Sequence, residues 1–404
     1  MEIYQVGESV RDELLGQKPN DIGYVVIGSS VSEMKQNGFR RVGKFFPVFL
    51  HPENHDEYTL ARKKKEAGNG KTEYIFDTTA TLEDDLKCRD FTINALAKDP
   101  RTGAIIDLFN GQEDLKQKMI RHLDEKGFSD DPVRAIRMCR LAAQLGFQIA
   151  PETTALTNSL LEKGAFKKIP GERIWGEFRK ALNTQHFDSF LEIMHTSGVL
   201  KAVLPDVDKL WDMPEKAKYH PEGNSGAHTL LTIRASEQKD PLITFALMLH
   251  DIGKTRTKKE ILPSHHGHEI KGTPVIKKIC YRLKAPAKFR DFALLCCQNH
   301  MNFFHIQEMR IGTLYDFLKK VTNNFQDLET FERFAEVCRC DNYGRAIELT
   351  PEEKEKHNKS LQICRDTIQK TRGVNITAMP NFKNLFTDKG MEGKIREYII
   401  QRIQ

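Results

Sequence analysis

A change of residue pattern near position 130 constrains the fold of this chain more than any other feature. Upstream, strand-length apolar or alternating runs lie between Gly, Pro or Asn residues, at 24–28, 46–51, 57–62, 73–77 and 104–109. Downstream, apolar residues recur at helical spacing, first at Val133, Ile136, Leu141 and Leu145. The sequence therefore predicts an α+β head followed by an all-α body.

The head also contains helical pieces, such as SVRDELLG, which ends on Gly16 and suits a helix C-cap.

A polar, Pro-containing stretch at 211–226 divides the helical body. We place a domain boundary in that stretch. The predicted parts are a head at 1–125, a helical neck at 126–215, a second helical domain at 216–350 and a helical tail at 351–404.

Composition limits the class of protein. The 404 residues carry a formal net charge of +6, which suits a polyanionic partner without proving one. No apolar run approaches the roughly 20 residues of a membrane helix, and the charged N-terminus does not resemble a signal peptide. We expect a cytoplasmic protein with no membrane partner. The 8 cysteines form no CxxC pair, so we expect free thiols rather than a zinc site of that type.

A basic, Gly-containing stretch, RKKKEAGNGK at 62–71, is predicted to be a flexible loop. Such a loop is either a solvated surface segment or one that closes over a phosphate. The C-terminal tail also carries more basic than acidic residues. Phosphate contact and a solvated helical face explain that excess equally well.

Two acids in the head stand where strands begin. Asp21 precedes the run YVVIG, and Glu57 opens the run EYTLAR. Carboxylates are the hard ligands that Mg²⁺ prefers, and acids at i and i+2 of a strand share one face. Position 23 holds Gly, so the pair with Asp21 is incomplete. Taken alone, each acid fits an ordinary surface residue better than a metal ligand.

A second set of polar residues lies in the body. His250 and Asp251 end the apolar run ITFALML, His228 precedes them, and Asp341 follows far downstream. Imidazole and carboxylate together bind divalent transition metals such as Ni²⁺ or Mn²⁺. The alternative is a set of structural histidines. Lys254 could hold a phosphate, and His265, His266 or His268 could assist there.

Six motifs follow one another in order, among them FPVFLHP, TLEDDLKCRDFTINALA and DDPVRAIRMCRLAAQLGF. Together they resemble the bacterial class II tRNA nucleotidyltransferases, the CCA-adding enzymes, and specifically the multifunctional type with a C-terminal HD phosphohydrolase domain. The resemblance implies a polymerase-β-like nucleotidyltransferase head with a mixed sheet. It also implies template-free addition of C, C and A to tRNA from CTP and ATP, with Mg²⁺ held by Asp21 and Glu57.

The resemblance assigns nucleotide contacts residue by residue. Arg11 falls on an arginine that touches the triphosphate, and Arg89 on one that faces the nucleotide. Asp131 and Arg134 fall on the pair that reads the Watson–Crick edge of the incoming base, an Asp accepting from an amine and an Arg donating to ring acceptors. Arg137 follows one helical turn later on the same face.

This chain departs from the family pattern at three positions. The D-x-D pair reads Asp21-Ile22-Gly23, the opening Gly-Gly reads Gly7-Glu8 beside the triphosphate site, and Cys88 replaces an Arg before Arg89. Gly23 removes a metal ligand, and Glu8 adds a negative charge. We hypothesise that the head polymerises poorly or not at all, unless Glu8 serves as a replacement ligand.

For the body, the resemblance implies a metal-dependent HD phosphohydrolase that acts on 2′,3′-cyclic phosphates or phosphomonoesters. The resemblance assigns its metal ligands to His228, His250, Asp251 and Asp341. The implied catalytic residues are Asp21 and Glu57 in the head, and His250 and Asp251 in the body. The alternative is a tRNA-docking hydrolase with an inactive head. A poly(A)-adding relative and a tRNA-binding regulator fit less well, and a homodimer is compatible with the sequence.

Overall fold

The computed structural model describes residues 1–404 except 20, 43–46, 67–71, 238–239, 380–390 and 404. The chain folds into two compact units, of which the first contains Met1–Pro170 with Ile193–Ala202. The second contains Gly171–Glu192 with Val203–Gln404. The four-part division expected from the sequence stays a prediction.

A mixed seven-stranded sheet forms the core of the first unit, in the order β3-β4-β5-β2-β1-β8-β9. β2 pairs with β5 in parallel, and the other neighbours are antiparallel. The strands are β1 (Glu2–Val6), β2 (Gly23–Ile27), β3 (Arg40–Arg41), β4 (Val48–Leu50), β5 (Glu57–Leu60), β8 (Leu96–Lys98) and β9 (Ile105–Asp107). The mixed-sheet head predicted from the sequence is confirmed.

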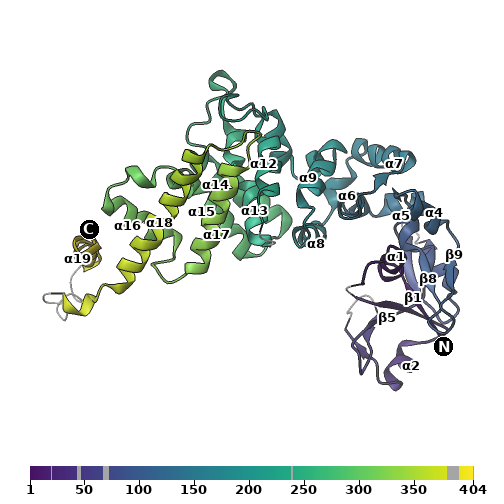
Figure 1. Cartoon of the computed structure of the whole chain (residues 1–404). Helices are drawn as coiled ribbons and strands as arrows, with labels where there is room; N and C mark the ends of the chain where they lie inside the picture. The colour runs from purple at the N-terminus through teal and green to yellow at the C-terminus, as the bar shows by residue number, and fades with distance from the viewer. Residues whose placement is uncertain (20, 43–46, 67–71, 238–239, 380–390, 404) are drawn as a thin grey trace. The chain divides into compact units, whose positions relative to one another are not determined.

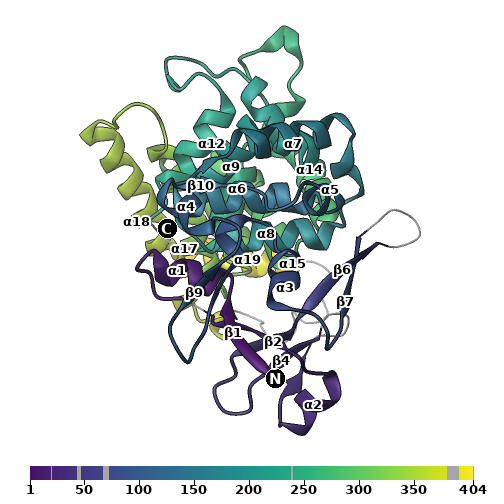
Figure 2. The same cartoon turned by 90° about the vertical axis from the view of Figure 1, so that its right-hand side faces the viewer.

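The charged stretch after β5 is a strand rather than a loop. β6 (Arg62–Glu66) pairs antiparallel with β7 (Thr72–Phe76) as a separate two-stranded ribbon (Figure 2). The Arg62 guanidinium lies 5.1 Å from the Tyr74 ring centre, a contact that favours the paired state over a solvated one. The loop prediction is therefore wrong for 62–66, and its remainder, 67–71, lies outside the described residues.

Helices surround this sheet and continue the unit beyond it. Gly7, at φ 79°, allows the turn from β1 into the first helix, and Gly16, at φ 71°, follows its end as expected. The elements are α1 (Glu8–Leu14), α2 (Val31–Gln36), α3 (Leu82–Leu86), α4 (Gly111–Lys116), β10 (Met119–Ile120), α5 (Glu125–Asp130), α6 (Val133–Leu145), β11 (Gln148–Ile149) and α7 (Pro151–Glu162).

Among its described residues, the second unit is built mainly of helices joined by loops. Figure 1 shows α12 to α15 and α17 gathered together, and they pack against one another. Trp175, Phe245 and Phe289 meet edge to face and join α8, α13 and α15. α9 (Phe187–Thr196) spans the division between the units, and α10 (Val199–Val203) lies almost wholly in the first. The other helices of the second unit are α8 (Gly171–Leu182), α11 (Pro205–Asp208), α12 (Ser225–Arg234), α13 (Pro241–Leu249), α14 (His268–Leu283), α15 (Ala287–Phe303), α16 (Ile311–Val321), α17 (Leu328–Tyr343), α18 (Pro351–Gly373) and α19 (Met391–Ile403).

Two glycines bring a short 3₁₀ helix, η4 (Ile252–Arg256), against α14. A Cβ atom on Gly253 would lie 1.8 Å from the carbonyl oxygen of His268 and 2.6 Å from the amide nitrogen of Gly272. Both are backbone atoms, so a side chain there must separate the two elements. The absence of a Cβ therefore fixes how closely the segment after Asp251 approaches the start of α14.

All 8 cysteines are free and buried, as expected. Burial raises the pKa of the thiols, to about 12 at Cys139, Cys280 and Cys364. Among the described residues, every helix is too short or too polar to cross a lipid bilayer.

We predict that Gly253→Ala lowers the free energy of unfolding by about 1–3 kcal/mol or more, because the close approach is overpacked. Gly176→Ala is the matched control, since a Cβ there meets nothing within 4 Å. The control should be neutral or stabilising by up to about 1 kcal/mol, as alanine favours helix. Urea denaturation measures both, and equal midpoints for the two variants would contradict the packing argument.

Candidate metal centre and nucleotide-transfer head

The four residues predicted as metal ligands in the body meet in the second unit. His228 lies on α12, His250 and Asp251 follow α13, and Asp341 lies near the end of α17. His228 Nε2 is 3.0 Å from Asp341 Oδ1, and His250 Nε2 is 3.3 Å from Asp251 Oδ2 and 3.6 Å from Asp341 Oδ1. All four side chains are buried. Three helical segments thus bring two imidazoles and two carboxylates to one point.

Hydrogen bonds orient the two imidazoles toward that point. His250 Nδ1 donates to the Leu247 carbonyl at 2.8 Å, so its Nε2 lone pair faces the carboxylates. His228 Nδ1 lies 3.0 Å from Glu222 Oε1, which also contacts His220 Nδ1 at 2.9 Å. Burial would raise the pKa of Glu222, but its hydrogen bonds, first of all from His228, outweigh burial and lower that pKa to about 2. Glu222 therefore holds the ring of His228, a predicted metal ligand, in position.

The donor set fits a divalent cation. His250 Nε2 is buried and makes no hydrogen bond among the described residues, although two carboxylates lie nearby. Burial lowers the pKa of His250, yet the charges of Asp251 and Asp341 outweigh it and raise the pKa to about 10. A cation among these atoms would satisfy the orphaned nitrogen and both carboxylates at once.

Two further histidines lie on the other side of Asp251. His268 Nε2, at the start of α14, is 3.2 Å from Asp251 Oδ1, and His300 Nε2, on α15, is 3.6 Å from the same oxygen. The sequence drew attention to His268 as a phosphate contact and missed His300. His300 follows Cys296 and Cys297 on one predicted helix, and nothing in this pattern distinguishes a metal ligand from a core residue.

Lys254 lies between two carboxylates. Its ammonium is 2.7 Å from Asp251 Oδ2 and 2.7 Å from Glu215 Oε1, and the residue is 7% exposed. These contacts balance the buried charge of Asp251. The phosphate contact expected of Lys254 stays a prediction.

In the first unit, the sheet places the altered position, Gly23, opposite one of the two predicted acids. Gly23 is the register partner of Glu57 across the parallel β2–β5 pair, and Asp21 lies two residues earlier at the entrance to β2. A Cβ on Gly23 would meet only the Val6 carbonyl, at 3.7 Å. Position 23 therefore has room for a side chain beside Glu57. Within the described residues, the head contains no group of three metal-ligating side chains like those of the second unit.

Glu8 lies among the arginines at the start of α1. Its Oε1 is 4.0 Å from Arg11 Nη1 and 3.8 Å from Arg140 Nη2, and its side chain is half exposed. Arg11 is 1% exposed and donates to Asp12 and to Asn94 Oδ1 at 2.9 Å. The protein's own groups thus surround the guanidinium predicted to face a triphosphate.

The remaining predicted nucleotide contacts also have partners within the unit. Arg89 pairs with Asp85 at 3.0 Å, and Arg137 with Asp90 at 2.7 Å. Arg134 donates to the backbone carbonyls of Arg89 and Cys88 and to the Tyr74 hydroxyl. Asp131 lies in the bend between α5 and α6. Their nucleotide-binding roles stay predictions.

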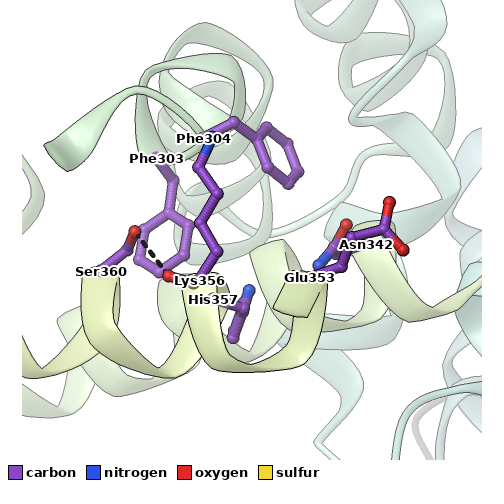
Figure 3. A pocket seen from close by; sticks show the side chains of 7 residues that line it. All are labelled: Phe303, Phe304, Asn342, Glu353, Lys356, His357 and Ser360. Atoms are coloured by element: carbon purple, nitrogen blue, oxygen red, sulfur yellow. Dashed lines mark hydrogen bonds between the residues drawn. The ribbon is translucent and has the colours of Figure 1, made fainter. Parts of the chain in front are cut away.

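A small pocket lies beside the last turn of α17, between α15 and α18 (Figure 3). Ser360 donates to the Lys356 carbonyl at its floor, at 3.0 Å. Its lining contains none of the metal-cluster side chains described above, and consists of Phe303, Phe304, Asn342, Glu353, Lys356, His357 and Ser360.

Family models match two parts of the chain. Residues 3–121 match the family described as "Poly A polymerase head domain", and residues 146–210 match "Probable RNA and SrmB- binding site of polymerase A".

Curated relatives match most of the length. A "Multifunctional CCA protein" of Dechloromonas aromatica is 42% identical over 350 residues, 85% of this chain and 84% of the relative. A protein of the same name from Acinetobacter baumannii is 38% identical over 99% of this chain and 95% of its own.

Solved structures share the fold. A CCA-adding enzyme of Bacillus stearothermophilus in complex with CTP has a TM-score of 0.65 at 21% identity, covering 99% of this chain and 93% of its own. A Thermotoga maritima CCA-adding enzyme complexed with tRNA has a TM-score of 0.60 at 20% identity, covering 99% and 87%.

We predict that Mn²⁺ at 100 times its dissociation constant raises the free energy of unfolding by about 2.7 kcal/mol, because the cation binds the folded cluster only. Asp341→Asn, which removes a carboxylate from the cluster, should abolish most of this gain. The control is Asp366→Asn, which changes an exposed acid on α18. Thermal unfolding with and without chelator measures the effect, and an unchanged gain in Asp341→Asn would refute this ligand assignment.

Proposed function

This chain belongs to the multifunctional CCA protein family, and from that premise we propose that it is an enzyme that matures or repairs tRNA 3′ ends. Two activities are assigned to it: CCA-type nucleotidyl transfer by the first unit, impaired at Gly23 and Glu8, and metal-dependent phosphoester hydrolysis by the second. The first would use CTP, ATP and Mg²⁺, and the second a transition metal such as Ni²⁺ or Mn²⁺.

One observation carries the hydrolase: the ligand atoms of His228, His250 and Asp341 lie within 4.8 Å of one another on buried residues, and Asp251 Oδ2 is 3.3 Å from His250 Nε2. A divalent cation supplies Lewis-acid polarisation of a phosphoester and lowers the pKa of a water molecule. Glu222 and the Leu247 carbonyl hold the imidazoles in the tautomer that presents Nε2. Lys254 offsets the charge of Asp251 and keeps that carboxylate ionised.

The substrates proposed for this unit are 2′,3′-cyclic phosphates and phosphomonoesters at RNA ends. The family's nucleotidyl transfer acts on a free 3′ hydroxyl, and a terminal phosphate blocks that group. A hydrolase that clears such ends therefore fits an enzyme of tRNA repair. tRNA itself would be read through backbone and shape, and residues 146–210, which match an RNA-binding family, are the proposed contact.

The alternative is a hydrolase whose head docks RNA without polymerising. Gly23 and Glu8 favour it, because one removes a metal ligand and the other places a carboxylate within 4.0 Å of Arg11 Nη1. Loss of even an outer-sphere partner of a metal costs about 10 to 100-fold, and loss of a direct ligand should cost more. The presence of Asp21 and Glu57 favours retention of some activity.

We predict that Asp251→Asn and His250→Ala each lower hydrolysis of 2′,3′-cyclic CMP by more than about 100-fold, because each removes a metal ligand. Asp366→Asn is the control, as it changes an exposed acid outside the cluster. Steady-state hydrolysis with added Ni²⁺ or Mn²⁺ provides the rates, and tRNA affinity should be the same in all variants. A normal rate in Asp251→Asn would overturn the hydrolase assignment.

For the head, we predict that the double reversion Gly23→Asp, Glu8→Gly raises CTP and ATP incorporation into a tRNA lacking CCA by at least about 10-fold. Space at position 23 permits the new carboxylate. Gly23→Asn with Glu8→Gly is the matched control, because it restores bulk without charge. Near-normal turnover of the unaltered chain would show that the head is not impaired. An inactive double reversion would favour the docking alternative.

A further inference from the structure

The pocket between the ends of α15 and α17 and the start of α18 contains polar side chains that the fold leaves without partners. Asn342 and His357 both line it (Figure 3) and are 8% and 6% exposed. Within the part of the chain that the structure describes, neither side chain makes a hydrogen bond. Buried amides and imidazoles without a partner are rare and costly. Two of them around one cavity therefore indicate a bound molecule that supplies the missing hydrogen bonds.

Aromatic rings form other walls of the same pocket. Phe303, the last residue of α15, is buried, and Phe304 follows it and is half-buried. The ring centre of Phe303 lies 5.2 Å from that of His357 and 6.5 Å from that of Phe304. The cavity has a volume of about 190 Å³. Pockets for drug-sized ligands measure about 300–1,000 Å³, so this one suits a single small ring system.

The hydrogen-bonding groups of the pocket match the edge of a nucleobase. The Asn342 amide offers a donor and an acceptor side by side. Burial lowers the pKa of the His357 imidazole, and Arg339 lowers it further, so the neutral ring adds one donor and one acceptor. Nucleobases carry neighbouring donors and acceptors on their edges and flat faces that stack on aromatic rings. A purely apolar ring would leave the buried amide without a partner.

Two helices connect this pocket to the metal cluster. On α17, Asn342 directly follows Asp341, a predicted metal ligand. On α15, Phe303 lies one helical turn after His300, whose Nε2 is 3.6 Å from Asp251 Oδ1. A molecule that fills the pocket is therefore held by the same two helices that carry the cluster side chains.

Building on the proposed hydrolase, on which this inference rests, we propose that the pocket binds the base of the ribonucleotide whose phosphate the cluster hydrolyses. Asn342 and His357 bind the edge of the base, and Phe303 and Phe304 contact its faces. The substrate class of the second unit is then base-bearing ribonucleotide ends rather than phosphoesters in general. Binding energy from a group remote from the reacting bond orients the phosphate and raises kcat/KM.

The test uses the full chain loaded with Mn²⁺ and two substrates that share a five-membered cyclic phosphate. One is 2′,3′-cyclic AMP, and the other is glycerol 1,2-cyclic phosphate, which has no base. We expect kcat/KM of the unaltered chain to be at least about 10-fold higher for the nucleotide, as about 1.4 kcal/mol of base binding gives a factor of 10.

Two variants test the residues of the pocket. Asn342→Leu, which keeps the volume, and His357→Leu should each lower kcat/KM for 2′,3′-cyclic AMP by about 10-fold, because each leaves part of the base edge unpaired. Both should hydrolyse glycerol 1,2-cyclic phosphate and bind Mn²⁺ as the unaltered chain does. Asp366→Asn, an exposed change on α18, is the control and should alter neither substrate.

Equal kcat/KM values for the two substrates in the unaltered chain would overturn the base pocket and leave the hydrolase standing. That readout needs no variant, so a failure of either variant to fold does not affect it. A nucleotide preference that both variants retain would also overturn it, as would equal losses on both substrates, which would assign Asn342 to the support of Asp341.

Hydrolysis of neither substrate would refute the proposed function instead. Saturation-transfer NMR with adenosine then tests the pocket by itself. Adenosine bound by the unaltered chain and lost in both variants would sustain the pocket, and no binding at millimolar adenosine would refute it.

Discussion

The arrangement of the second unit depends on the burial of one carboxylate. Asp251 is 3% exposed, and an ionised carboxylate at that depth costs several kcal/mol unless cations and donors surround it. Its partners come from η4, the end of α13, α14 and α15, while His228 and Asp341 add α12 and α17. Helix packing and polar chemistry are therefore mutually dependent in this unit: moving any one of these helices would leave a buried charge without its partner.

In the first unit, the fold does not depend on the residues of the predicted reaction finding a ligand. Its arginines bind the protein itself: Arg11 to Asn94, Arg134 to backbone carbonyls, and Arg137 to Asp90. Burial would raise the pKa of Asp90, yet Arg137 outweighs it and holds that pKa well below its usual range. Because these contacts need no nucleotide, the head keeps its fold with Gly at position 23.

The fold class could be predicted from the spacing of apolar residues and from the order of the motifs. Apolar or alternating runs marked most strands of the sheet, and the ordered motifs carried a family resemblance that is confirmed. The charged residues RKKKE led to the wrong prediction of a loop at β6. In the structure, pairing with β7 outweighs the preference of these side chains for water. In the body, the adjacency of His250 and Asp251 after an apolar run made the predicted ligands recognisable. Glu222 and His300 were missed. Glu222 contacts His228 only 6 residues later, within a polar break that carried no motif, and His300 contacts His268 across 32 residues that no sequence spacing links.

The buried thiols have a practical consequence. With all 8 cysteines enclosed and their pKa values raised, the chain offers maleimide reagents little reactive sulfur at neutral pH. One cysteine introduced on either unit's surface would then carry a fluorophore or spin label at a chosen position, without prior replacement of the native ones.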